Sequence, residues 1–217
     1  MRRFLPILLT PSLVGALLAS CGPKPLELPA DPIDKAATCA VVSAARARAA
    51  QADIKAELPF AEQLRITHYA MLAGSEGDSF NIDRASAVAK KMGELQEQIT
   101  AGEWQKLEPA CDEAYPATIK TSGIELPAGK FDAQLGCYAM GDFLRRSVAT
   151  VDEKGQSELA GYDKMKRELD TAVGAGMKAK GANNFAKTQA MKNEALSGMA
   201  KLGAPAETMK MCTAKFG

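Results

Sequence analysis

The sequence is poor in the residues from which most catalytic sites are built. Of its 217 residues only His68 is a histidine, and aromatic residues make up 6%. No serine–histidine–aspartate order with a nucleophile elbow is found, and a cysteine nucleophile would need a histidine partner. His68 has the surroundings of a partly buried helix residue, with a catalytic or ligand role as the alternative. We therefore predict that the protein is not an enzyme.

Sequence motifs for cofactors and metals are also missing. There is no CxxC pair, haem attachment motif, phosphate loop or dinucleotide fingerprint. Met209, Met211 and Cys212 lie close together, and thioether and thiolate ligands suit Cu(I). Residues two apart on a helix point in different directions, however, and helical methionines usually fill gaps in a core. We expect no cofactor and no metal site, and keep Cu(I) handling by Met-rich helices as an alternative.

Neither sign of charge dominates, which excludes a general nucleic-acid binder. The chain has 27 Lys and Arg against 26 Asp and Glu. Residues 171–217 hold seven lysines and two glutamates, a local excess of five positive charges. Such an excess is typical of a solvated helix face, with contact to anionic lipid or glycan as the alternative.

Long apolar runs are absent, but a short one opens the chain. Two arginines precede an apolar stretch from Phe4 to Ala19, which Pro6 and Pro11 interrupt. This stretch is shorter than the roughly 20 residues that a membrane-spanning helix needs. A charged start, a short apolar core and a small-residue cleavage site predict a secretion signal over residues 1–20.

The end of this segment carries a specific pattern. Leu18-Ala19-Ser20-Cys21 resembles the lipobox of bacterial lipoproteins: an aliphatic residue, two small residues and a cysteine. In that class the thiol takes a diacylglycerol, a peptidase cuts just before the cysteine, and the new amino group is acylated. The resemblance implies that Cys21 is lipidated and anchors the chain to the cell envelope, facing the periplasm. Gly22 stands where an Asp would favour the inner membrane, so we expect the outer membrane. The alternative is an ordinary secreted protein.

The rest of the composition is typical of a helical protein, because alanine and methionine are plentiful while valine, isoleucine and aromatics are sparse. Prolines over residues 21–32 predict an extended tether, and prolines with glycines over 116–130 predict a connector. Asp31 followed by Pro32 marks a helix start. Gly174, Gly176 and Gly181 are expected to loosen the region between two of the helices. Helices are predicted over about 32–57, 60–72, 82–100, 104–111, 131–151, 157–173, 184–201 and 205–216.

Landmarks recur at matching distances in the two halves, 33–115 and 131–217. Cys39 lies 72 residues before Cys111, and Cys137 lies 75 before Cys212. The residue nine before the second cysteine is glycine in both halves, and an aromatic residue stands four after it. The pattern predicts a duplicated unit of four helices, with chance similarity between Ala-rich helices as the alternative.

The repeat also indicates how the cysteines pair. If Cys21 is lipidated, four cysteines remain. An even number of cysteines in an exported protein favours disulfides, and four cysteines can pair in three ways. A duplicated unit favours Cys39–Cys111 and Cys137–Cys212, with the crossed pairings as alternatives.

The sequence thus predicts an all-α helical bundle of two similar, roughly four-helix units, each closed by a disulfide. The expected role is that of a lipid-anchored envelope lipoprotein with a binding or structural function toward an envelope protein or glycan. A periplasmic inhibitor or immunity-type protein that neutralises an envelope-acting enzyme is the alternative.

Overall fold

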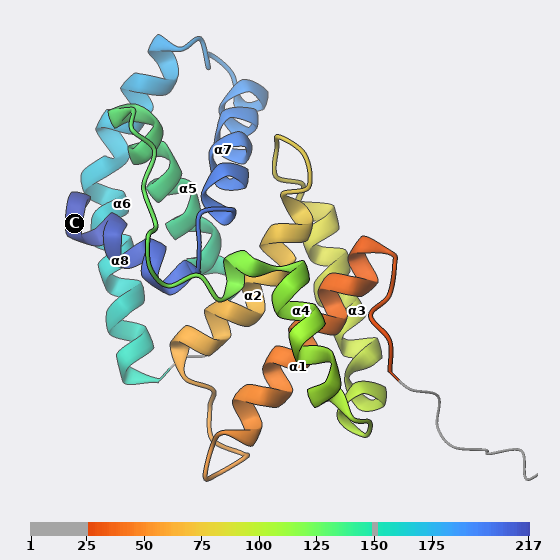
Figure 1. The fold of residues 1–217 in the computed structure, drawn as a ribbon. Helices are drawn as coiled ribbons and strands as arrows, with labels where there is room; N and C mark the ends of the chain where they lie inside the picture. The colour runs from red at the N-terminus through yellow and green to blue at the C-terminus, as the bar shows by residue number, and fades with distance from the viewer. Residues whose placement is uncertain (1–25, 149–151) are drawn as a thin grey trace, which may run out of the picture.

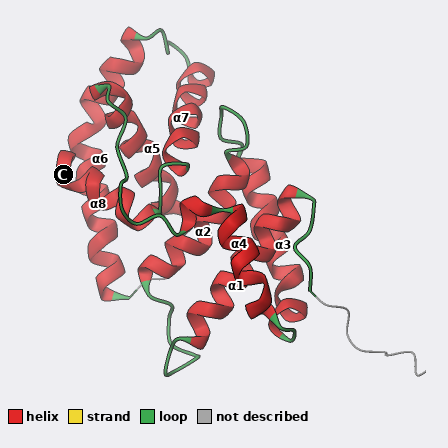
Figure 2. Ribbon diagram, viewed as in Figure 1, coloured by secondary structure: helices red, strands yellow, loops and turns green. Residues whose placement is uncertain are grey.

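The structure is a computed structural model that describes residues 26–148 and 152–217. The predicted all-α fold is confirmed: the described residues form helices and connecting loops, without strands (Figure 2). The helices are α1 (Pro32–Ala49), α2 (Phe60–Gly74), α3 (Ile82–Thr100), η1 (Trp104–Leu107), α4 (Glu108–Ala114), η2 (Pro116–Thr118), α5 (Lys130–Ser147), α6 (Glu153–Ala179), α7 (Phe185–Ala200) and α8 (Pro205–Phe216).

Polar side chains begin four of the helices, as capping requires. The Asp31 carboxylate accepts hydrogen bonds from the backbone N–H groups of Ile33 and Asp34, at 2.9 and 3.0 Å, so the predicted start of α1 is confirmed. Side chains at the N-caps of α3, α6 and α7 do the same; they are Asn81, Asp152 and Asn184.

Expectations about the length of three helices are wrong. Helix α5 ends at Ser147 rather than near residue 151. Helix α1 ends at Ala49 rather than near residue 57, and the Gln51 side chain donates to the Glu57 carbonyl across the loop that follows. Helix α6 runs unbroken through Gly174 and Gly176, which were expected to loosen this region. Gly176 faces the ring of Phe131 so closely that a Cβ would collide with it. The glycine thus permits close packing of α6 on α5.

The helices form two four-helix units that lie side by side (Figure 1). In the first unit α1 packs against α2 and α3, and in the second α5 packs against α6 and α7. Helices α1 and α5 correspond closely: each has 18 residues, and Cys39 and Cys137 are both eighth in their helix. The predicted pair of similar units is therefore present.

The seam between the units is formed mainly by α2, which contacts α5, α7 and α8. The rings of Phe80 and Phe143 meet edge to face at 5.1 Å across it. The backbone N–H of Phe80 donates to the Asn193 carbonyl at 3.0 Å. Buried residues of both units belong to a single hydrophobic core, so the two units form one body.

A short extended segment precedes the first helix of each unit and packs back onto that unit. We call these segments, residues 26–31 and 124–129, the straps. Leu26 lies against Gly102 and Ile124 lies against Gly203, which are the two glycines nine residues before Cys111 and Cys212. The folded units therefore begin inside the segments 21–32 and 116–130 that were expected to act as tether and connector.

The straps also carry a sequence match that the comparison of the halves missed. Residues 26–30 read LELPA and residues 124–128 read IELPA. They lie 98 positions apart, the same offset that relates Cys39 to Cys137. The match supports a duplication whose unit includes the strap as well as four helices.

This packing yields a prediction for Gly203. A Cβ there would lie 2.6 Å from Ile124 Cδ1 and 2.9 Å from the Lys120 carbonyl oxygen, which is backbone and cannot rotate away. We expect Gly203→Ala to lower the free energy of unfolding by about 2 kcal/mol, as for other overpacked sites. Chemical denaturation measures the change.

Two matched variants calibrate this measurement. Gly102→Ala should cost less, because its nearest neighbour, 2.7 Å away, is the end of the flexible Leu26 side chain. Gly198→Ala should be neutral or slightly stabilising, because nothing lies within 4 Å of the added Cβ. Equal costs at all three glycines would contradict the strap packing.

Candidate functional site

The structure joins four of the five predicted site cysteines as expected. Cys39 bonds to Cys111, with Cα atoms 5.4 Å apart, and Cys137 bonds to Cys212, with Cα atoms 5.5 Å apart. The predicted pairing is confirmed, and each disulfide ties the first helix of a unit to its last. Cys21, the predicted lipidation site, lies outside the described residues.

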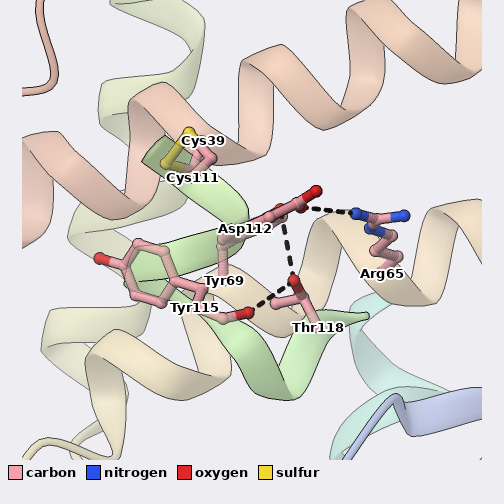
Figure 3. Close-up of a disulfide and its surroundings, with 7 residues drawn as sticks. All are labelled: Cys39, Arg65, Tyr69, Cys111, Asp112, Tyr115 and Thr118. Atoms are coloured by element: carbon pink, nitrogen blue, oxygen red, sulfur yellow. Dashed lines mark hydrogen bonds and ion pairs between the residues drawn. A yellow bond between two sulfur atoms is a disulfide. The ribbon is translucent and has the colours of Figure 1, made fainter. Parts of the chain in front are cut away.

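A polar cluster lies beside the Cys39–Cys111 disulfide and connects α2 to α4 and to η2, which follows α4 (Figure 3). Arg65 forms an ion pair with Asp112 at 3.2 Å. Thr118 donates to the Tyr115 carbonyl at 2.8 Å and lies 3.5 Å from the Tyr69 hydroxyl. Burial raises the pKa of Tyr69, so its hydroxyl stays protonated at neutral pH. The arrangement fixes the end of the first unit, and the cavity lined by Arg65, Tyr69 and Asp112 has a volume of only about 10 Å³.

His68 lies at the seam and is fully buried. Its Nε2 is 2.7 Å from the Ala200 carbonyl oxygen, so Nε2 must carry the proton and donate. Nδ1 has no partner in the described structure. Burial lowers the pKa of His68 to about 4, so the ring is neutral at physiological pH. It joins α2 of the first unit to the end of α7 in the second.

The methionines behind the Cu(I) alternative point in different directions, as expected. Met209 is fully buried, whereas Met211 is 36% exposed. Met209 and Met165 both pack on Gly141, and Met199 packs on Gly136. These thioethers fill the space that two glycines of α5 leave. No cluster of three or more His, Cys, Asp or Glu that could hold a metal occurs in residues 26–148 and 152–217.

A groove of about 640 Å³ lies beside the seam and is lined by residues of α5, of α7 and of the segment that leads into α3. Buried apolar side chains form its floor: Phe80, Ala139, Phe143 and Leu196. Ile82, at the rim, is 57% exposed. Polar side chains complete the wall: Asp142, Arg146, Ser147, Gln189, Lys192 and Asn193. We refer to it as the seam groove.

The wall of the seam groove contains one carboxylate, that of Asp142, and this carboxylate is already ion-paired. Asp142 forms ion pairs with Arg146, at 2.6 Å, and with Lys166. Acid–base pairs such as those of glycosidases need two carboxyl groups facing one reacting bond. The seam groove instead combines an apolar floor with amide and cationic side chains.

Sequence reasoning did not find the seam groove. Its floor consists of Phe80 from the first unit and three residues from the second. No local sequence pattern indicates that the two units contact each other at these residues. The spacing of Gln189, Lys192, Asn193 and Leu196, three to four residues apart, places them on one helix face but does not tell what covers that face.

The comparisons with known proteins gave no match to a family model, to a curated protein or to a solved structure. Within residues 26–148 and 152–217, none of the helices has the length and apolar character needed to cross a membrane.

Proposed function

We propose that this chain is a lipid-anchored bacterial envelope lipoprotein with a non-enzymatic binding role. The observation that carries the binding role is the seam groove, whose volume lies in the range of ligand pockets. The lipobox ending in Cys21 supports the anchor. On this proposal Cys21 holds the protein to the outer membrane on its periplasmic side, and the seam groove receives an envelope partner.

The anchor predicts the behaviour of Cys21→Ser. Labelled palmitate should enter the wild-type protein and not this variant, and the variant should keep residues 1–20 and migrate as the longer precursor. Ser20→Ala preserves a small residue beside the cysteine and should still be labelled. Palmitate incorporation into Cys21→Ser would show that the anchor is assigned to the wrong residue.

The binding role is tested in intact envelopes. A photo-crosslinking amino acid is placed at Gln189, on the wall of the seam groove, and as a control at Lys90, on the exposed side of α3. We expect a discrete adduct from position 189 that is absent from position 90. The same adduct from both positions, or none from position 189, would contradict a binding role for the seam groove.

A further inference from the structure

One positive charge on the wall of the seam groove has no negative partner. Asp142 is shared by Arg146 and Lys166. Lys192 forms no ion pair in the part of the chain that the structure describes, and its Nζ lies 5.0 Å from the centre of the Tyr138 ring. Lys192 is half-buried. Lys192 thus lines the groove while its ammonium group lies against the Tyr138 ring, which Lys166 also contacts at 5.5 Å, and it has no carboxylate partner among the described residues.

The amides beside Lys192 are aligned with each other. Gln189 Nε2 donates to Asn193 Oδ1 at 2.7 Å. This bond leaves Gln189 Oε1 as an acceptor and Asn193 Nδ2 as a donor on the wall of the groove. One acceptor and one donor side by side match the N–H and C=O groups of an extended peptide backbone.

The floor provides the apolar part of the site. Phe80 and Phe143 are 5% and 8% exposed, so their rings are already packed and present a fixed surface. The exposed Ile82 stands at the edge of this surface. An aliphatic side chain entering the groove would cover Ile82 and these rings, and the removal of apolar area from water favours its binding.

We propose that the seam groove binds an acidic, extended peptide segment of a partner protein. An aliphatic side chain of the segment lies on the floor, its backbone pairs with the amides of Gln189 and Asn193, and a neighbouring carboxylate pairs with Lys192. The proposal rests on the binding role above and names the chemistry of the partner. Charge complementarity carries it, because the wall offers an unpaired cation and no free carboxylate.

Short peptides test this chemistry directly. The full chain with Cys21→Ser, labelled with ¹⁵N, is titrated with blocked peptides Gly-Glu-Leu-Glu-Gly, Gly-Lys-Leu-Lys-Gly and Gly-Glu-Gly-Glu-Gly, and with an N-acetylglucosamine oligomer. We expect the first peptide to shift the amide signals of Ser147, Gln189 and Asn193. The lysine peptide and the peptide without leucine should bind at least about tenfold more weakly, a difference of roughly 1.4 kcal/mol.

Two lysine variants test whether Lys192 provides the charge that binds the acidic peptide. Lys192→Gln should weaken binding of the acidic peptide by about tenfold, whereas Lys187→Gln, an exposed lysine on α7 that does not line the groove, should leave it unchanged. Equal affinity for the acidic and basic peptides, shifts mapping elsewhere, or stronger binding of the sugar oligomer would overturn the proposal. If no peptide binds while position 189 still crosslinks in envelopes, the peptide chemistry fails and the binding role stands.

Discussion

Replacing both cysteines of either disulfide by alanine should lower the free energy of unfolding by roughly 4 kcal/mol. The bridges close loops of 72 and 75 residues, and in the chain-entropy model loops of this length restrict the unfolded chain by about that amount. Because the closures are nearly equal, Cys39→Ala/Cys111→Ala and Cys137→Ala/Cys212→Ala should lose similar stability. Urea denaturation of the two variants and the wild type measures this.

Such a loss is a large part of the 5–15 kcal/mol that keeps an ordinary domain folded. Removal of both bridges should therefore leave a chain that is mostly unfolded at physiological temperature. Cys21→Ala is the control, since it removes a cysteine without opening either loop. A loss below about 1 kcal/mol for either pair would show that the bridge adds little to the packing of its unit.

Acidification should destabilise the protein through His68. The unfolded chain takes up a proton on this histidine below about pH 6.5, whereas the folded protein resists protonation down to about pH 4. Between these values the unfolded state binds more protons, so stability falls as the pH is lowered from 6.5 to 4. At 1.36 kcal/mol for each pKa unit, the loss over this window is about 3 kcal/mol.

His68→Gln separates this effect from the titration of carboxylates. The glutamine amide can still donate to the Ala200 carbonyl but does not titrate. The difference in unfolding free energy between wild type and variant should therefore shift by about 3 kcal/mol, against the wild type, between pH 7 and pH 4. Parallel pH curves for the two proteins would contradict the assignment of this acid sensitivity to His68.

The parts of the fold that the sequence predicts are those set by local chemistry and by spacing. Asp31 and Pro32 mark the start of α1 because capping depends on neighbouring residues alone. The similar spacing of the cysteines in the two halves, 72 and 75 residues, favoured the observed disulfide pairing over the crossed ones. The end of α1 and the continuity of α6 were predicted wrongly. For α6 the reason is the close contact of Gly176 with Phe131, which lies far from it in sequence and is not visible in any local pattern.

The straps and the seam groove could not be predicted because both depend on contacts between segments that are distant in the sequence. A segment rich in proline is compatible both with a free tether and with an extended segment that packs, and the packing of Leu26 against Gly102 decides between them for residues 26–31. The match between LELPA and IELPA was readable in the sequence, but its meaning depended on recognising that both segments belong to the units. The groove requires the relative placement of two units, which no local pattern encodes.

The strap of the first unit also sets how far the protein can reach. Leu26 lies five positions after Cys21, and a fully extended chain of that length spans at most about 18 Å. With lipid on Cys21, the first unit would stay within that short distance of the bilayer surface. Because Leu26 packs against Gly102, a pull on an anchor at Cys21 would reach the first unit at the turn that follows α3.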